Sequence, residues 1–306
     1  MNTDDLCPLR KDRLVSTLRA IIASTRPRQW TKNLLVFAAL VFAGDFFDGQ
    51  RVLLACAAFV VFCLLSGSVY IVNDLIDAEA DRAHPRKASR PIASGALGAR
   101  AATVAAITLG SLGVAGSFAL GVRVGVIAVG YLALQVAYSL VLKKLVIVDA
   151  MTVAAGFVLR AVAGAFAIGV PISAWLFLCT FLLALFLALA KRRHELLLLD
   201  EDAGAHRESL REYSAPFIDS MLSSTVAATI LAYALYTVST TGGDRFHYLM
   251  GTVPFVAYGL FRYLFLVHRR DLGGSPEDVL LTDRPLIIDI VAWLIATGVI
   301  VYVLPS

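Results

Sequence analysis

Long apolar segments are the feature that most constrains how this chain can fold. The 306-residue sequence contains nine segments of about twenty mainly apolar residues, the length that an α-helix needs to cross a bilayer. Apolar residues make up 58% of the chain and charged residues 16%, an imbalance too large for the core of a soluble domain. The sequence therefore predicts an all-α polytopic membrane protein, with spans at about 28–46, 52–73, 99–120, 123–142, 145–169, 173–192, 215–240, 247–267 and 285–304.

Lysine and arginine residues are concentrated in alternate connections between these spans. With a cytoplasmic N-terminus, 22 of the 27 Lys and Arg residues fall on the cytoplasmic side, where membrane proteins carry such an excess. We expect a multi-pass protein of the cytoplasmic membrane with its N-terminus inside, its C-terminus outside and a cavity facing the cytoplasm. Residues 1–25 are interpreted as a cytoplasmic tail and residues 26–306 as the transmembrane catalytic domain. Membrane lipids are expected partners, and nucleic acid is not.

A polar stretch at 73–95, NDLIDAEADRAHPRKASRPIASG, interrupts the apolar pattern. Helical residues advance about 100° each, so Asp74, Asp77 and Asp81 share one face of a helix. Asn73 lies at the edge of this face. Three such carboxylates repel one another unless a cation lies among them, and oxygen ligands suit Mg²⁺. The alternative is a solvated helix end whose acids pair with nearby arginines.

Basic residues follow these acids at short intervals. His84, Lys87 and Arg90 recur every three residues, and the prolines beside them indicate a bent loop. Carboxylates that hold a metal ion, followed by cations, form an arrangement that binds a diphosphate. We therefore predict that Lys87 and Arg90 bind the same diphosphate as the Mg²⁺ held by Asn73 and the three aspartates.

The motif N-D-x-x-D-x-x-x-D at 73–81 resembles the first aspartate-rich motif of the UbiA superfamily of intramembrane prenyltransferases. Longer strings resemble the phosphoribosyl-transferring branch of that superfamily: R-P-R-Q-W-T-K-N at 26–33, H-P-x-K-x-x-R-P-I-A-S-G at 84–95 and K-R-R-H-E at 191–195. The resemblance runs from about residue 26 to the end. It implies transfer of a 5-phosphoribosyl group from phosphoribosyl pyrophosphate to decaprenyl (polyprenyl) phosphate, with release of pyrophosphate, to supply the arabinose donor of mycobacterial-type cell walls.

The chain departs from most of the superfamily between the sixth and seventh predicted spans. Most members carry a second aspartate-rich motif there, whereas this chain has cations, one carboxylate and the consecutive acids at 200–202, which cannot share a helix face. A donor with a 5-phosphate and an acceptor phosphate would need extra cations. We therefore predict that Lys191, Arg192 and Glu195 orient these groups. The alternative is membrane anchoring beside a solvated loop.

Two further pairs are candidates for substrate binding. Lys32 and Asn33 open the first predicted span and, by the family pattern, face the entry to the cavity. Tyr138 and Lys143, in Y-S-L-V-L-K-K, resemble the tyrosine–lysine element of the superfamily at a slightly different spacing. For the second pair, anchoring at the membrane interface is the alternative.

A charged residue also lies deep in the fifth predicted span. Arg160 should face the bundle interior, where it either pairs with a buried acid or binds the lipid phosphate. Asp149 lies on the same helix face but roughly 16 Å away, too far to neutralise Arg160 directly.

These patterns together predict a Mg²⁺-dependent phosphoribosyltransferase whose catalytic residues are Asp74, Asp77, Asp81, Lys191 and Glu195. One alternative is a UbiA-type aromatic prenyltransferase. The absence of the second aspartate motif argues against this alternative. A membrane transporter is another, but it should show inverted repeats and ionisable groups near the midplane of both halves. The sequence leaves open whether the protein forms a homo-oligomer.

Overall fold

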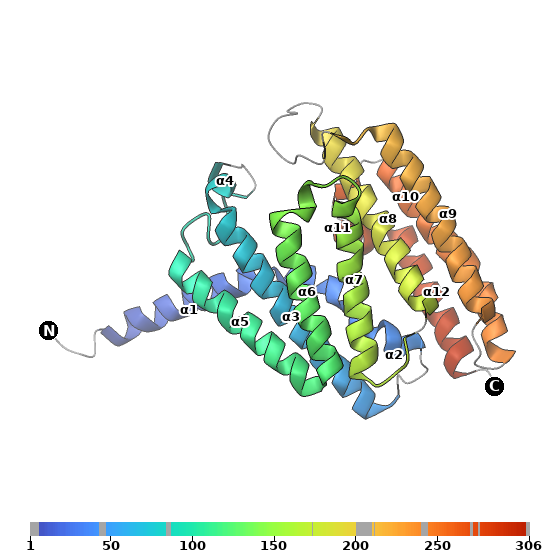
Figure 1. The fold of residues 1–306 in the computed structure, drawn as a ribbon, viewed down its shortest axis with the longest axis horizontal. Helices are drawn as coiled ribbons and strands as arrows, with labels where there is room; N and C mark the ends of the chain where they lie inside the picture. The colour runs from blue at the N-terminus through green and yellow to red at the C-terminus, as the bar shows by residue number, and fades with distance from the viewer. Residues whose placement is uncertain are drawn as a thin grey trace. The chain divides into compact units, whose positions relative to one another are not determined.

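Helices make up all the regular structure in the part of the chain that the structure describes. This computed structural model describes residues 6–42, 47–83, 87–172, 174–199, 210, 212–239, 244–269, 272–274 and 276–303. Seven of its helices are long and apolar enough to cross a membrane. The protein is therefore an all-α, multi-pass integral membrane protein, as predicted, while the count of nine spans and the orientation of the termini stay predictions (Figure 1).

The elements are named in chain order, with α for α-helices and η for 3₁₀ helices. They are α1 (Leu6–Ser24), η1 (Pro27–Phe37), α2 (Ala38–Phe42), α3 (Gly49–Ile76), α4 (Ala78–Ala83), α5 (Ala99–Leu120), α6 (Val122–Leu140), η2 (Leu142–Lys144), α7 (Val148–Ala167), α8 (Ala174–Leu199), α9 (Ala215–Ser239), η4 (Asp244–Thr252), α10 (Val253–Arg269), η5 (Leu272–Gly274), α11 (Pro276–Thr282) and α12 (Arg284–Tyr302).

Most predicted spans correspond to one helix each, and two do not begin as an α-helix. The segment predicted as a span at 28–46 forms the 3₁₀ helix η1 followed by the short helix α2. The polar run that opens this segment bonds locally instead: the Trp30 indole, for example, donates to the carbonyl of Thr25 at 3.2 Å. The eighth span begins as η4 and becomes α-helical at α10, whose second residue is Pro254. Proline is tolerated there because the first turn of a helix needs no N–H partner.

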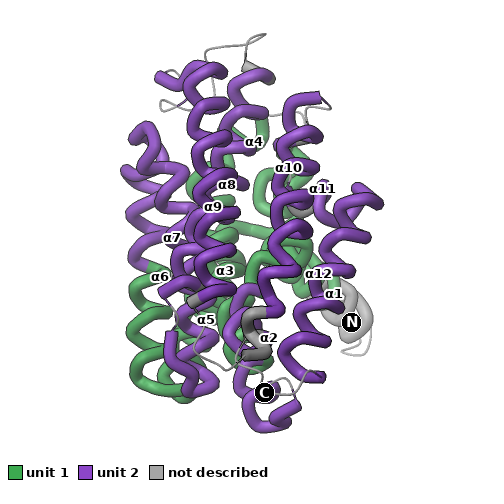
Figure 2. The backbone as a smooth tube through the Cα atoms, turned by 90° about the vertical axis from the view of Figure 1, so that its right-hand side faces the viewer, with its two compact units in different colours: residues 1–34, 56–132 green, residues 35–55, 133–306 purple. Residues whose placement is uncertain are grey.

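The chain forms two compact units, which Figure 2 shows in different colours. Unit 1 comprises Met1–Leu34 and Cys56–Leu132, and unit 2 comprises Leu35–Ala55 and Ala133–Ser306. Unit 1 thus contains α1, most of α3, α4, α5 and the first part of α6. Unit 2 contains α2, η2 and every element from α7 onward, together with the second part of α6.

Small residues bring α3 and α5 close together in unit 1. The Ser68 hydroxyl donates to the carbonyl of Ala106 at 2.8 Å, and a Cβ added to Gly110 would lie 3.0 Å from the same hydroxyl oxygen. A Cβ on Gly113 would lie 2.8 Å from the Leu65 side chain. Membrane helices pack through such small residues because lipid provides no hydrophobic force to drive helices together.

Large apolar side chains form the core of unit 2. Phe186 and Leu189 of α8 pack with Ile218 and Leu222 of α9 and with Leu266 of α10. All five side chains are 0% exposed. This core places the polar residues at the end of α8 among the ends of α7, α9 and α10.

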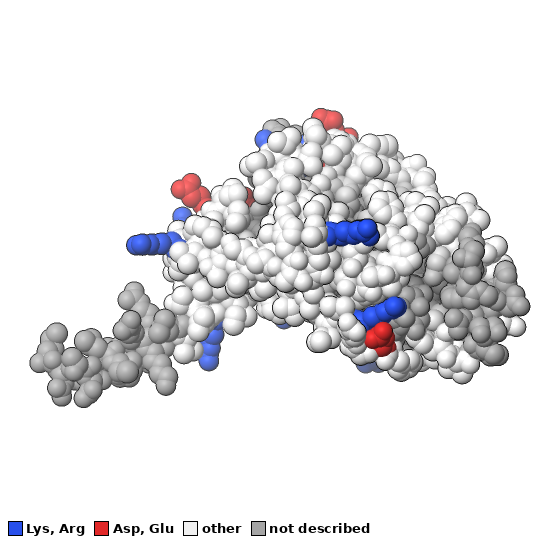
Figure 3. All heavy atoms as spheres, turned by 60° about the horizontal axis from the view of Figure 1, so that its bottom comes forward, with Lys and Arg blue, Asp and Glu red and all other residues white. Residues whose placement is uncertain are grey.

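The outer surface is largely apolar, as contact with lipid requires. Ile107 of α5 is 63% exposed and Ile288 of α12 is 68% exposed, which would be costly in water. Few charged side chains of the described residues lie on the face drawn in Figure 3.

Gly164 of α7 provides a test of packing within unit 2. A Cβ at this position would lie 2.8 Å from the carbonyl carbon of Val36, and backbone cannot move aside as a side chain can. We expect Gly164→Ala to lower the free energy of unfolding by about 3 kcal/mol, as overpacking does, and to lower the melting temperature in detergent. Gly298→Ala on α12, where an added Cβ meets nothing within 4 Å, is the control and should melt like the wild type.

Candidate functional site

The acidic motif lies where α3 ends and α4 begins, in unit 1. The predicted continuous helix is interrupted at Asp77, which forms a turn between the two helices. The amide of Asp77 still donates to the carbonyl of Asn73 at 2.9 Å, and that of Asp81 to the carbonyl of Asp77 at 2.8 Å. The helical hydrogen-bond pattern therefore continues through the turn, while Asp77 itself is exposed and Asp74 and Asp81 are buried.

Arg90 joins the two buried carboxylates of this motif. Its Nη1 atom donates to Asp74 Oδ1 at 3.1 Å and to Asp81 Oδ2 at 2.5 Å. The guanidinium of Arg26 also donates to Asp74 Oδ1, and Lys87 Nζ lies 3.9 Å from Asp81 Oδ1. Asp74 and Asp81 are each 2% exposed, so these cations provide the charge compensation that water would otherwise supply.

The loop at 87–97 holds Arg90 in this position. Ile92 and Leu97 are 4% and 1% exposed and pack in the core of unit 1, so the segment is fixed on both sides of its bend. The amide of Leu97 closes the bend by donating to the carbonyl of Pro91 at 2.8 Å. Gly95 has a φ of +81°, which a residue with a side chain rarely adopts. This geometry accounts for the string R-P-I-A-S-G, whereas His84 lies outside the described residues.

The acids of this motif fit a Mg²⁺ ion that keeps part of its water shell. Asp74 Oδ2 is buried and has no hydrogen-bond partner among the described residues. Mg²⁺ is commonly held by one or two carboxylates together with water and substrate phosphates. The described residues contain no group of three His, Cys, Asp or Glu side chains close enough to hold one ion, and Asp77 is exposed whereas the other two acids are buried. Asp74 and Asp81 are the buried pair that could hold it, and Arg90 contacts both of them.

Asn33 lies in the packing of unit 1. It is 1% exposed, and its amide nitrogen donates to Ser66 Oγ at 3.2 Å and lies 3.3 Å from Cys63 Sγ. These are contacts between η1 and α3, so the Asn33 side chain lies at a helix interface. The sequence had predicted that it faces the entry to the cavity. Lys32, its neighbour in η1, is partly buried.

A second polar cluster lies at the end of α8, in unit 2. Arg192 is 2% exposed; its Nε atom lies 2.8 Å from Asp149 Oδ2, and its Nη1 atom donates to Glu195. Its Nη2 atom lies 3.5 Å from the Tyr138 hydroxyl of α6. The structure thus brings together Tyr138, Arg192 and Glu195, which the sequence singled out, and adds Asp149. Partly buried Lys191 precedes Arg192, and partly buried Lys143 lies in η2.

Arg160 is the deep cation of α7. It is 5% exposed, donates to the carbonyl of Gly156 at 2.8 Å, and lies 5.4 Å from the centre of the Phe157 ring. Asp149 on the same helix pairs with Arg192. Binding of a lipid phosphate by Arg160 stays a prediction.

The acids at 200–202 lie outside the described residues.

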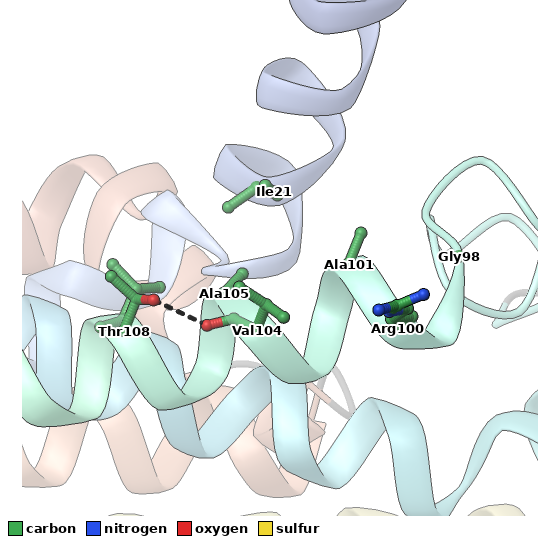
Figure 4. Close-up of a pocket in the computed structure, with 8 residues that line it drawn as sticks. Ile21, Gly98, Arg100, Ala101, Val104, Ala105 and Thr108 are labelled. Atoms are coloured by element: carbon green, nitrogen blue, oxygen red, sulfur yellow. Dashed lines mark hydrogen bonds between the residues drawn. The ribbon is translucent and has the colours of Figure 1, made fainter.

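A separate groove in unit 1 does not involve these residues. It encloses about 700 Å³ between α1 and α5 and is lined by Ile21 and by residues from Gly98 to Leu109. Figure 4 shows Ile21 of α1 above Ala101 and Ala105 of α5, with Arg100 near one end. Its lining is mainly apolar, which suits lipid and offers no group for the predicted chemistry.

Comparison with known proteins defines the class to which this chain belongs. Residues 33–277 match the UbiA prenyltransferase family, and the chain is a member of that family. This confirms the family that the aspartate motif indicated.

Among its relatives are proteins named decaprenyl-phosphate phosphoribosyltransferase. The chain is 36% identical to the one from Mycobacterium tuberculosis H37Rv, over 91% of this chain and 93% of that protein. It is 37% identical to the one from Corynebacterium glutamicum, over 93% of this chain and 87% of that protein. A solved structure of a UbiA homolog from Archaeoglobus fulgidus, bound to GPP and Mg²⁺, has a TM-score of 0.71 at 19% identity and covers 92% of this chain and 99% of that one. This last likeness shows the fold.

Replacement of Arg90 tests its role as the cation between the two acids. In Arg90→Ala, the buried carboxylates lose a partner, and we expect the free energy of unfolding to fall by about 1–3 kcal/mol in EDTA. Added Mg²⁺ should then raise the melting temperature more in this variant than in the wild type, because the ion takes the place of the guanidinium. Thermal unfolding in detergent measures both effects.

The matched control is Arg100→Ala, which removes an exposed arginine from α5 of the same unit. It should melt like the wild type with and without Mg²⁺. Equal Mg²⁺ shifts in the wild type and Arg90→Ala would contradict the proposed exchange of cations.

Proposed function

We propose that this protein transfers the 5-phosphoribosyl group of phosphoribosyl pyrophosphate to decaprenyl (polyprenyl) phosphate and releases pyrophosphate. The observation that carries the proposal is the identity of 36% and 37%, over 91% and 93% of the chain, to relatives named for decaprenyl-phosphate phosphoribosyl transfer. The arrangement of acids and cations in each unit supports it, since both substrates carry phosphate groups.

The aspartate cluster suits the pyrophosphate end of the donor. We propose Asn73, Asp74, Asp77 and Asp81 as ligands for Mg²⁺, directly or through water. The bound ion would neutralise the charge that develops on the departing pyrophosphate. Arg90 and Lys87 are already beside the two buried acids, so they can donate charge-assisted hydrogen bonds to phosphate oxygens when Mg²⁺ takes their place.

The remaining candidate residues suit the ribose phosphate and the acceptor. In the reaction, an oxygen of the lipid phosphate forms a bond to C1 of the ribose while the bond from C1 to pyrophosphate breaks. No general base is needed, because a phosphate monoester is already anionic at neutral pH. We propose that Lys191, Arg192 and Glu195 orient these groups, and that the substrate-binding residues also include Lys32, Asn33, Tyr138, Lys143 and Arg160.

The chemistry of the substrates and the distribution of basic residues support a cytoplasmic location for the reaction. A sugar with several phosphates cannot cross hydrocarbon, so it must reach the protein from an aqueous side, while the prenyl chain stays in the bilayer. The excess of Lys and Arg in alternate connections favours the cytoplasmic side. We propose that the protein lies in the cytoplasmic membrane with its N-terminus and active site on the cytoplasmic side.

The choice of donor provides the first test. We expect purified protein in detergent to release pyrophosphate from phosphoribosyl pyrophosphate only when decaprenyl phosphate is added, and EDTA to abolish this release. A prenyl diphosphate offered with an aromatic acceptor should give no product. If the protein instead turned over the prenyl diphosphate with the aromatic acceptor, and not phosphoribosyl pyrophosphate with decaprenyl phosphate, it would be an aromatic prenyltransferase.

A neutral replacement of Asp81 tests the proposed metal ligands. Asp81→Asn keeps the shape of the side chain but removes the charge that would hold Mg²⁺, so we expect kcat to fall by about 10²–10³-fold. Glu79→Gln removes an exposed carboxylate of the same short helix and should leave kcat unchanged. Wild-type activity of a folded Asp81→Asn protein would contradict the assignment.

A further inference from the structure

A buried tyrosine and aspartate in unit 2 have no place in the reaction described above. Tyr213, just before α9, is 5% exposed, and Asp149, in the first turn of α7, is 0% exposed. The Tyr213 hydroxyl donates to Asp149 Oδ1 at 3.0 Å. Burial, and then the nearby Asp149 carboxylate, raise the pKa of Tyr213, so its hydroxyl keeps its proton at neutral pH and remains a donor. This pair therefore joins two distant parts of the chain by a hydrogen bond.

Tyr213 also stabilises the backbone that leads into α7. The amide of Ile147 donates to the Tyr213 hydroxyl at 2.7 Å, and Ile147 has a φ of +69°. A β-branched residue in this conformation costs about 1–3 kcal/mol and persists only where its surroundings hold it. The hydroxyl of Tyr213 thus helps to set the direction in which α7 begins and Asp149 projects.

Asp149 in turn holds Arg192. Its second carboxylate oxygen lies 2.8 Å from Arg192 Nε, and the opposite edge of the guanidinium donates to Glu195. The Arg192 side chain is 3% exposed, whereas that of Glu195 is 28% exposed. Because Asp149 and Arg192 attract each other as a buried ion pair, Asp149 helps to fix the position of the guanidinium, which in turn donates to Glu195. Tyr213, Asp149 and Arg192 are therefore linked by buried polar contacts, and the last of them contacts the partly exposed carboxylate of Glu195.

The end of α8 is also held from other sides. The Nε atom of Arg193 donates to Asp219 of α9 at 2.6 Å. His194 packs on Gly274 of η5, where an added Cβ would lie 2.5 Å from the imidazole Nε2. Consecutive residues point in directions about 100° apart, so these contacts prevent the helix end from rotating. With the helix end held in this way, the bond from Arg192 helps to hold the Glu195 carboxylate in place.

We propose that Tyr213 and Asp149 are positioning residues which, through Arg192, hold the Glu195 carboxylate ready to accept hydrogen bonds from the ribose hydroxyls of the donor. The inference rests on the proposed function and adds donor selection to it. A carboxylate of fixed orientation binds neighbouring hydroxyls well, and a prenyl diphosphate has no such hydroxyls to offer. A site built to bond a substrate hydroxyl discriminates strongly against analogues that lack it.

The central test compares two buried tyrosines of unit 2. Tyr213→Phe removes the hydroxyl that bonds Asp149, and we expect the KM for phosphoribosyl pyrophosphate to rise about tenfold, with little change in kcat or in the KM for decaprenyl phosphate. Tyr233→Phe is the matched control, since Tyr233 is 6% exposed and its hydroxyl lies 2.7 Å from Thr252 Oγ1 and accepts from Trp293 at 3.0 Å. It should lower the melting temperature to a similar degree and leave both KM values unchanged.

A double-mutant cycle tests whether Tyr213 acts through Glu195. In the background of Glu195→Ala, Tyr213→Phe should change the donor KM by less than about twofold, because the group that it positions is gone. The wild type should prefer phosphoribosyl pyrophosphate over its 2-deoxy analogue. In the Tyr213→Phe variant this preference should fall toward that of the Glu195→Ala variant. Should Tyr213→Phe fail to fold, Asp149→Asn takes its place with the same expected changes.

Several outcomes would overturn the inference. One is a Tyr213→Phe protein that is only less stable, with a wild-type donor KM. Another is a rise in the donor KM that Tyr213→Phe causes to the same extent in the wild type and in the Glu195→Ala protein. If the wild type turns over phosphoribosyl pyrophosphate and either result is found, the positioning role alone is refuted. If the wild type does not turn over this donor, the proposed function is refuted, and the positioning role with it.

Discussion

The neutralisation of buried carboxylates by arginine is the constraint on which this structure depends. Removing an ionised group from water costs several kcal/mol, and the cost is recovered only with a well-oriented partner. In unit 1, Arg90 satisfies Asp74 and Asp81 together. In unit 2, Arg192 lies between Asp149 and Glu195. Each arginine is anchored by the packing of its own segment, so the ion pairs orient the polar ends of otherwise apolar helices.

This way of neutralising charge prepares the protein for anionic substrates. A cation already paired with a carboxylate can exchange that partner for a phosphate oxygen, and a carboxylate so released can bind a metal ion. Asp74, with one buried oxygen still lacking a partner in the described residues, is suited to such an exchange. Arg192 differs, because its surroundings leave it 2% exposed. Its proposed contribution to orienting the substrates therefore includes holding Glu195.

Much of the fold and part of the candidate site could be predicted because they depend on local patterns. Hydropathy located most of the helices. The shared face expected for Asp74, Asp77 and Asp81 stays a prediction, although Arg90 contacts Asp74 and Asp81 together. The exposure of Asp77 was not predicted, since the structure has a turn at this residue in place of a continuous helix. Asn33 was expected at a cavity entry but fills a helix interface. Tyr213 was overlooked; an acid such as Asp149 at the start of an apolar helix signals that a partner must exist, without indicating which residue provides it.

What the sequence alone determines and what only the tertiary structure decides differ for a physical reason. Apolar length, helical period and the run of acids followed by bases act between near neighbours in the chain, so they establish a helical membrane protein with a polar motif of acids and bases before any tertiary contact forms. The pairing of Asp149 with Arg192 and Tyr213 joins residues far apart in sequence, and many arginines could have served equally well on charge alone. The partner was selected by the packing of α7, α8 and α9, because an ion pair in an apolar interior is stable only where helix packing brings its two groups into hydrogen-bonding distance.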